Sequence, residues 1–211
     1  MSRGSAALTS ARKEEIIQAC AKLYQTMSFK EITIKEIGAE TSFTRTSIYN
    51  YFETKEEIFL ALLQKEYELW SDAMRAVMER EAALTRQQVA GTLARTLTDR
   101  PRLLRLLSMN LYDMEANSRP ERLAEFKVAF GASLKTVEQL IQKYVPDMDA
   151  EARQRFLYAF FPFIYGIYPY TNVTEKQKAA MEQAGIPYAY QSAYDLTYTC
   201  LEKLLAKEES L

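Results

Sequence analysis

The sequence contains no histidine, and this absence removes several kinds of chemistry at once. Without imidazole the chain cannot form a histidine-based catalytic triad, a histidine metal site or a histidine pH switch. Only two cysteines are present, Cys20 and Cys200, and their separation rules out a cysteine zinc motif. We therefore expect no metal, no cofactor and no disulfide framework, with both thiols packed as small apolar groups.

Glycine and proline are also scarce, with six of each among 211 residues. This scarcity argues against a loop-rich architecture, and the abundance of Ala, Leu, Glu, Lys, Gln and Arg favours helix. The most apolar run, residues 156–170, is shorter than the ~20 residues that a membrane span requires. No signal-peptide pattern is visible either. The sequence predicts an all-α, cytoplasmic protein of about nine helices that does not associate with membranes.

The sequence also lacks a large excess of either positive or negative residues, because its formal net charge is -1. The whole molecule is therefore not a polybasic nucleic-acid binder. Residues 1–55 carry eight Lys or Arg against six Glu, a net of +2 that leaves -3 for the rest. Any DNA binding must rest on geometry and a few well-placed cations. Carboxylates lie among cations on charged helix faces and no nucleophile–base pair stands out, so we expect no enzyme activity.

What the sequence does contain is a dense series of helix-start signals within residues 33–55. Thr33, Thr44 and Thr54 stand where three successive helices would begin, and Thr33 and Thr54 have Glu three residues later, as in a capping box. The first two helices share a short turn at residues 41–43, which is typical of a helix-turn-helix. The exposed face of the second helix would carry hydrogen-bonding side chains of the kind that contact bases or phosphates.

The segment Ile16–Phe59, IIQACAKLYQTMSFKEITIKEIGAETSFTRTSIYNYFETKEEIF, resembles the DNA-binding domain of the tetracycline-repressor (TetR) family of transcriptional regulators. The likeness rests on the apolar pattern of the first helix, on Thr33, and on the two short sequences Ile48-Tyr49-x-Tyr51-Phe52 and Lys55-Glu56-Glu57. Family members often have Gly where this chain has Ser28, Ser42 and Thr46, and often have His where it has Asn50.

The resemblance implies a three-helix helix-turn-helix domain over residues 11–70 and a helical ligand-binding and dimerisation domain over residues 71–211. It implies that the helix at 44–51 enters the major groove of DNA. For Thr33 and Thr44, plain helix capping is an equal alternative to DNA contact. For Arg45 and Lys55, the alternative is a solvated surface charge. The predicted DNA-contacting residues are Thr33, Thr44, Arg45, Thr46, Tyr49, Asn50 and Lys55.

Aromatic residues are concentrated towards the C-terminus, where eight of the fourteen tyrosines fall between residues 158 and 198. Such stripes are typical of a core or an interface, and the alternative is the lining of a ligand cavity. The resemblance implies a homodimer formed through helices at about 150–168 and 188–206. It also implies an effector pocket, for which we predict Trp70, Met74, Met109, Tyr112, Phe126, Phe130, Phe160 and Tyr165.

The function that the resemblance implies is a ligand-responsive transcriptional regulator. Its partners would be a palindromic double-stranded DNA operator, a small-molecule effector and a second copy of the chain, and we expect a repressor that an inducer releases. The alternative is a helical small-molecule-binding or interaction protein whose DNA-binding motif is not functional. The mild charge asymmetry favours this alternative.

Overall fold

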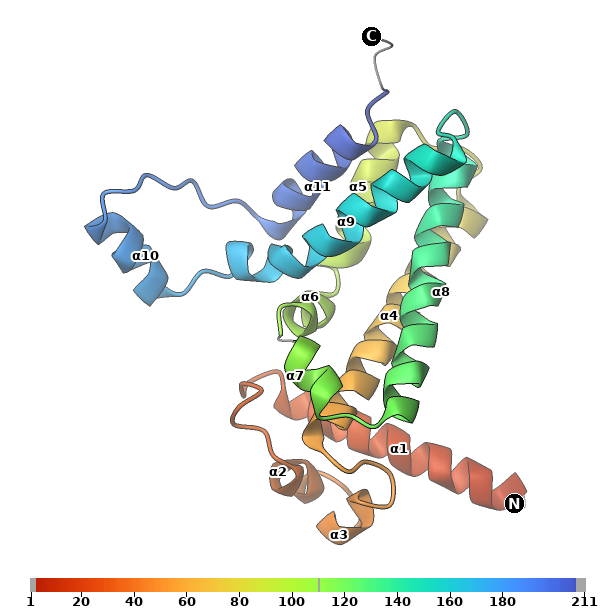
Figure 1. The fold of residues 1–211 in the computed structure, drawn as a ribbon, viewed down its shortest axis with the longest axis vertical. Coiled ribbons are helices and arrows are strands. Elements are labelled where there is room, and N and C mark those ends of the chain that lie inside the picture. The colour runs from red at the N-terminus through yellow and green to blue at the C-terminus, as the bar shows by residue number, and fades with distance from the viewer. Residues whose placement is uncertain (1–2, 110, 208–211) are drawn as a thin grey trace. The chain divides into compact units, whose positions relative to one another are not determined.

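The computed structural model describes residues 3–109 and 111–207, and this described part contains eleven α-helices and no strand. The prediction of an all-α chain is confirmed. In order (Figure 1), the helices are α1 (Arg3–Leu23), α2 (Ile34–Ala39), α3 (Arg45–Ile48), α4 (Lys55–Arg80), α5 (Arg86–Thr98), α6 (Pro101–Leu107), α7 (Leu111–Ala116), α8 (Pro120–Tyr144), α9 (Ala150–Thr171), α10 (Glu175–Gln183) and α11 (Ala193–Leu204).

The number of helices exceeds the expected nine partly because one leucine-rich segment forms two short helices. The leucine-rich segment after Pro101 forms α6 and α7 rather than a single helix. Ser108 ends α6, and its hydroxyl donates to the carbonyl of Arg105 at 2.7 Å, which favours a turn over a further helical turn. Pro101 itself lies in the first turn of α6, where a missing backbone N–H costs no helical hydrogen bond.

Capping side chains explain where several other helices begin. The side-chain oxygens of Thr85, Asp149, Thr174 and Ser192 each accept the backbone N–H of the third residue of the following helix. The cap at Ser192 also explains why the last helix begins at residue 193 and not near 188, the start that the resemblance implied.

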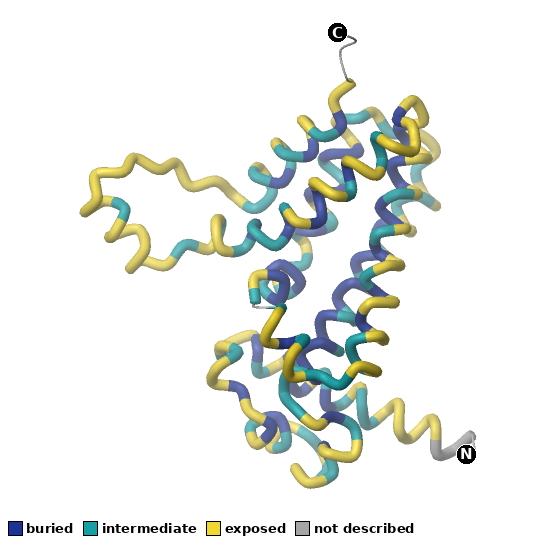
Figure 2. The backbone as a smooth tube through the Cα atoms, in the orientation of Figure 1, coloured by how far each residue is buried: buried dark blue, intermediate teal, exposed yellow. Residues whose placement is uncertain are grey.

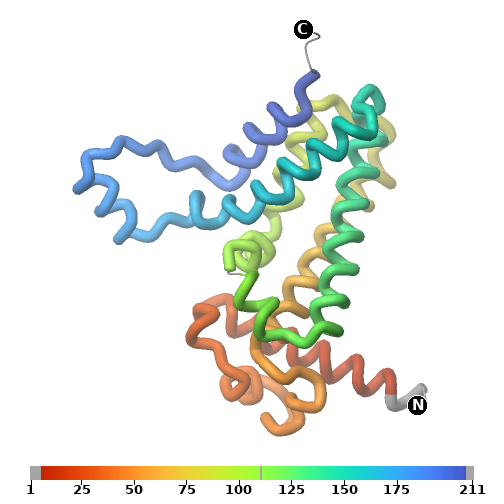
Figure 3. Tube along the Cα trace, in the orientation of Figure 1, coloured from red at the N-terminus to blue at the C-terminus, as the bar shows by residue number. Residues whose placement is uncertain are grey.

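The chain divides into two compact units, of which the first combines two separate stretches of sequence. This first unit comprises residues 1–65 and 110–130, and the second comprises residues 66–109 and 131–211. In Figure 3 the green segment that contains α7 and the start of α8 returns to the red and orange N-terminal helices. The N-terminal helices are therefore completed by residues that lie far away in sequence.

The core of the first unit forms behind the helix-turn-helix. Phe59 of α4 packs edge-on against Tyr24 and Phe29, with ring centroids 5.2 and 4.8 Å apart. Ile37 of α2 and Ile48 of α3 are fully buried, so each of these short helices has one face fixed to the core. Aromatic pairs in this geometry add about 0.5–1.5 kcal/mol beyond the burial of their area.

In the second unit α11 packs against α5 and α9, and α6 packs against α9. Trp70 of α4 is fully buried in this unit, with its ring 6.4 and 6.0 Å from those of Phe160 and Phe161. Its indole N–H donates to the hydroxyl of Thr96 at 3.1 Å, which satisfies its only polar group.

Cys200 is only partly buried in the second unit, whereas Cys20 is fully buried in the first unit, as expected.

The connection from α9 to α11 is largely exposed to solvent. None of the residues of α10 is buried, and Figure 2 shows this connection as an almost continuous exposed stretch. Within the described residues, no helix combines the length and apolar character needed to cross a membrane.

Candidate nucleic-acid interface

The helix-turn-helix of the first unit consists of α2 and α3, which pack against each other. Thr33 caps α2, because its hydroxyl accepts the N–H of Lys35. At the crossing, a Cβ added to Gly38 would lie 3.1 Å from the Cβ of Arg45 and 3.2 Å from its Cα. A glycine thus permits the close approach of the two helices.

The turn between α2 and α3 is stabilised by α1. The backbone N–H of Ser42 donates to the carboxylate of Glu15, and this bond holds the pKa of Glu15 below its usual value. No non-glycine residue in the described part of the chain has a positive φ. Serine therefore serves at position 42, where glycine is frequent in the family that the sequence resembles, without left-handed backbone strain.

Helix α3 is short, and three of its four residues are polar. It comprises only the four residues Arg45–Ile48, and turns continue to residue 51. Thr44 begins the helix but makes no side-chain capping bond; its hydroxyl instead lies 3.0 Å from that of Ser47. The guanidinium of Arg45 donates weakly to the hydroxyl of Tyr49, at 3.5 Å.

Six of the seven predicted DNA-contacting residues have exposed side chains in the first unit. Five of the six lie between residues 44 and 50, on α3, its N-cap and the turn that follows it, and the sixth caps α2. The helix places these hydroxyl, amide and guanidinium groups within one short stretch, where a groove of DNA offers matching donors and acceptors. These six residues are Thr33, Thr44, Arg45, Thr46, Tyr49 and Asn50.

Lys55, the seventh predicted residue, is bound within the protein. Its ammonium donates to the carbonyls of Phe29 and Ile32 at 2.8 and 3.1 Å. It also lies 4.2 Å from the centre of the Phe29 ring, which is a cation–π distance. These contacts account for two of its three N–H donors. Lys55 therefore ties the start of α4 to the segment between α1 and α2.

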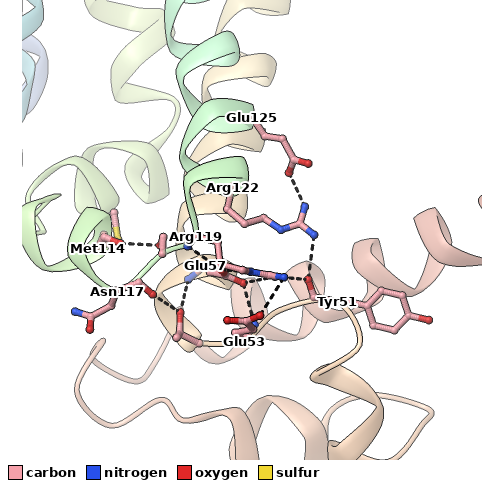
Figure 4. A network of polar contacts seen from close by, with 10 residues as sticks. Tyr51, Glu53, Glu57, Met114, Asn117, Arg119, Arg122 and Glu125 are labelled. Atoms are coloured by element: carbon pink, nitrogen blue, oxygen red, sulfur yellow. Dashed lines mark hydrogen bonds and ion pairs between the residues drawn. The ribbon is translucent and has the colours of Figure 1, made fainter.

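A buried carboxylate lies in the first turn of α4, the helix that follows the helix-turn-helix (Figure 4). Glu57, in the first turn of α4, has a fully buried side chain, and the guanidinium of Arg119 binds both of its oxygens, at 2.7 and 2.8 Å. The backbone N–H groups of Glu53 and Arg119 donate to the same carboxylate at 2.8 and 3.0 Å. Beside this pair, the hydroxyl of Thr54 donates to the carbonyl of Asn117 at 2.8 Å.

These contacts explain the ionisation of the pair. Burial alone would raise the pKa of Glu57, but the hydrogen bonds from Arg119 and from two backbone N–H groups outweigh it. The pKa of Glu57 is lowered from 4.5 to about 2. The same bonds raise the pKa of Arg119, so the pair is charged at every physiological pH.

A second arginine, Arg122 in the first turn of α8, reaches the end of the turn that follows α3. The guanidinium of Arg122 donates to the backbone carbonyl of Tyr51 at 3.1 Å, and Arg119 approaches the same oxygen at 3.4 Å (Figure 4). Arg122 is itself fixed, because it binds Glu125 at 2.6 Å and lies 5.4 Å from the centre of the Phe52 ring.

Sequence reasoning missed Arg119 and Arg122 because they lie more than sixty residues from the helix-turn-helix. It treated Glu57 as half of a capping box. One of the two hydrogen bonds of that box is present, since the backbone N–H of Glu57 donates to the hydroxyl of Thr54 at 3.2 Å. The carboxylate accepts the N–H of Glu53 rather than that of Thr54. An arginine directly before Pro120 at a helix start is the only local signal of the network.

The eight predicted pocket residues are divided between the units. Tyr112, Phe126 and Phe130 belong to the first unit, and the other five belong to the second. Trp70, Met74 and Phe160 are fully buried in the second unit, where the hydroxyl of Tyr165 lies 3.3 Å from that of Tyr67. Burial raises the pKa of Tyr67 well above its usual value.

Two surface cavities of the second unit have other linings. One, of about 490 Å³, lies between the start of α9 and the end of α11 and is edged by Arg86 and Lys203. The other, of about 790 Å³, lies along α4, α5 and α11 beside the stacked rings of Tyr194 and Tyr198. Neither is lined by any of the eight predicted pocket residues.

Comparison with known families decides how this geometry is to be interpreted. Residues 16–62 match the family described as "Bacterial regulatory proteins, tetR family", and residues 64–199 match "Tetracyclin repressor-like, C-terminal domain". The chain belongs to the TetR family. It is a TetR-type regulator with an N-terminal helix-turn-helix, as the resemblance implied, and neither matching family model describes an enzyme. No curated protein sequence matches the chain significantly.

Solved structures of TetR-family proteins share the fold over nearly the whole chain. A putative TetR-family transcriptional regulator from Mesorhizobium loti is 17% identical, with a TM-score of 0.63 over 97% of this chain and 98% of its own. The fatty acid degradation regulator FadR from Bacillus halodurans is 14% identical, with a TM-score of 0.59 over 93% and 96%. FadR from Thermus thermophilus, solved with lauroyl-CoA, is 17% identical, with a TM-score of 0.58 over 94% and 97%.

The depressed pKa of Glu57 predicts a specific acid sensitivity. A carboxyl whose folded pKa lies below its unfolded value contributes stability that is fully present above the unfolded pKa. For Glu57 that contribution is lost as the pH falls from about 4.5 towards about 2. Urea unfolding between pH 7 and pH 3 should therefore show a smaller acid-induced loss of unfolding free energy in Glu57→Gln than in the wild type. Equal losses in the two proteins would contradict the assigned pKa.

Proposed function

We propose that this chain is a ligand-responsive transcriptional repressor that binds a palindromic DNA operator as a homodimer and is released by a small-molecule inducer. The observation that carries the proposal is the set of adjacent exposed side chains on α3 and its following turn, in a helix-turn-helix of the TetR family. One turn of helix contacts few bases, and a two-fold symmetric dimer doubles the number read.

Selection of bound duplexes from a random DNA pool tests this proposal directly. We expect the selected duplexes to share an inverted repeat whose half-sites are spaced by about one helical turn or a multiple of it. The mass of the protein–DNA complex should correspond to an even number of protein chains. Selection of no common sequence, with the purified protein folded, would favour the alternative of a helical ligand-binding or interaction protein without DNA-binding function.

We assign the base contacts to Arg45, Thr46 and Asn50, and the phosphate contacts to Thr33, Thr44, Tyr49 and Lys55. Arg45 is the only cation of α3 and its side chain is exposed, which suits a bidentate contact with guanine. Lys55 has one N–H beyond the two that bind carbonyls, and it stands at the first residue of α4, where free backbone N–H groups favour a phosphate.

Two substitutions separate base contacts from phosphate contacts. Arg45→Ala should weaken binding to the selected duplex by about 1–3 kcal/mol and relax the sequence preference at one position. Lys55→Ala should weaken binding to every sequence and reduce the slope of log K against log salt by about one unit. Fluorescence anisotropy at four salt concentrations measures both effects. Lys178→Ala, on the exposed α10, is the control and should change neither quantity.

The effector site is proposed to lie in the second unit, bordered by Trp70, Met74, Met109, Phe160 and Tyr165. These residues supply an apolar surround, and the hydroxyls of Tyr67 and Tyr165 supply the sparse polar anchor that ligand sites use. Helix α4 begins only four residues after the turn that follows α3. A ligand that favours one orientation of α4 would therefore alter the placement of α3.

Lauroyl-CoA is the first probe, because the similar protein from Thermus thermophilus binds it. A panel of apolar and aromatic small molecules follows. We expect a ligand from this set to lower operator affinity at least fivefold, which is the lower bound of common allosteric coupling. Tyr165→Phe should weaken the binding of that ligand, as measured by calorimetry. If every ligand that binds leaves operator affinity unchanged, the coupling through α4 is wrong.

A further inference from the structure

We propose that Arg122, supported by Arg119, is a positioning residue for DNA recognition, holding the C-terminal end of the turn after α3 through the carbonyl of Tyr51. The proposal rests on the proposed DNA-binding function and deepens it. It assigns the orientation of the DNA-contacting residues to two side chains at and just before the start of α8, which lie outside the N-terminal family match of residues 16–62.

Helix α3 requires such support because of its length. Four helical residues cannot form a stable helix by themselves, since nucleation alone is unfavourable. Ile48 is the only buried residue of α3 and fixes one point of the helix to the core. The orientation of the exposed face therefore depends on what holds the two ends.

The two ends are held by different parts of the protein. Near the N-terminal end, the Ser42 N–H is bound by Glu15 of α1, and Gly38 of α2 allows close packing against Arg45. At the C-terminal end, backbone bonds run from the N–H groups of Tyr51 and Phe52 to the carbonyl of Ile48, at 2.8 and 3.0 Å. The Tyr51 carbonyl that follows is the oxygen that both arginines approach.

Arg122 is built to hold that oxygen in one place. Its side chain is only 15% exposed, its guanidinium binds Glu125 with one nitrogen and Tyr51 with another, and its Cζ lies 5.4 Å from the centre of the Phe52 ring. A planar guanidinium can serve two acceptors in fixed directions, whereas a lysine ammonium cannot reproduce this geometry. A cation beside the last carbonyls of a helical turn is also electrostatically favourable.

The chemistry of Arg122 separates it from the phosphate-contacting cations. Its two hydrogen bonds go to groups of the protein, the Glu125 carboxylate and the Tyr51 carbonyl, so its removal should withdraw no phosphate contact. Non-specific affinity depends on phosphate neutralisation, and specific affinity depends on how accurately the base contacts are placed. Loss of a positioning residue should therefore reduce specific binding selectively, because productive contacts tolerate misplacement of only about 0.5 Å.

The test uses the full-length protein and the variants Arg122→Met, Arg122→Lys and Arg75→Met. Arg75 is the matched control, because it also binds a carboxylate three residues away on its own helix, at 2.6 Å, but it belongs to the second unit. Affinities for the selected duplex and for a scrambled duplex are measured at four salt concentrations. Urea unfolding identifies conditions in which every variant is folded.

We expect Arg122→Met to weaken binding to the selected duplex about tenfold while binding to the scrambled duplex changes less than twofold. The salt slope for the scrambled duplex should stay unchanged. Arg122→Lys should recover only part of the loss, and Arg75→Met should resemble the wild type. Equal weakening on both duplexes with a slope lowered by about one unit would make Arg122 a phosphate contact and overturn the proposal.

Hydrogen exchange provides a second readout that does not depend on DNA. Without Arg122 the amides of Tyr51 and Phe52, which bind the Ile48 carbonyl, should exchange at least fivefold faster, while amides of the second unit are unaffected. Unchanged exchange at these amides would show that Arg122 does not hold the end of this turn, and would overturn the proposal. If the wild type selects no DNA sequence, the proposed function fails instead, and the wild-type measurement alone reveals this.

Discussion

The carboxylate of Glu57 is the group on which the first unit depends, because it is buried and ionised. Removing a charge from water costs several kcal/mol unless partners replace the lost hydration. Arg119 provides the charge, and backbone N–H groups of Glu53 and Arg119 provide further donors. The buried, ionised form of Glu57 is therefore stable only when the start of α8 is folded against the start of α4.

This requirement explains the composition of the first unit. A helix-turn-helix formed by residues 1–65 alone would leave Glu57 without its cation, and the Tyr51 carbonyl without its two arginine donors. Residues 110–130 supply both. Because α4 and α8 also contribute residues to the second unit, the two helices that meet at Glu57 both continue into the part of the chain where an effector is proposed to bind.

The extent to which the sequence predicted these features follows the range of the interactions. Caps at Thr33 and Asp149, the long α4 and the first turn at Pro101 depend on residues a few positions apart, and these were predictable. The Glu57–Arg119 pair joins residues sixty-two positions apart, so no local pattern distinguishes Glu57 from an ordinary capping glutamate.

The same limit applies to Lys55 and to the aromatic residues. A lysine at a helix start looks solvent-exposed in sequence, yet its ammonium binds two carbonyls of the segment between α1 and α2. The resemblance implied that Trp70 and Phe160 line an effector pocket, and both are fully buried. Spacing cannot separate a packed core from the wall of a cavity, because the two place the same residue types on the same face.

The position of the Glu57–Arg119 pair bears on how regulators of this kind can be recombined. Its two members lie on opposite sides of the boundary between the family matches, which end at residue 62 and begin at residue 64. A hybrid joined at that boundary would bring Glu57 into contact with whichever residue the other parent carries in place of Arg119. Modular exchange of specificities is therefore constrained by one buried charge, and a functional junction must transfer residues 110–130 together with the N-terminal helices.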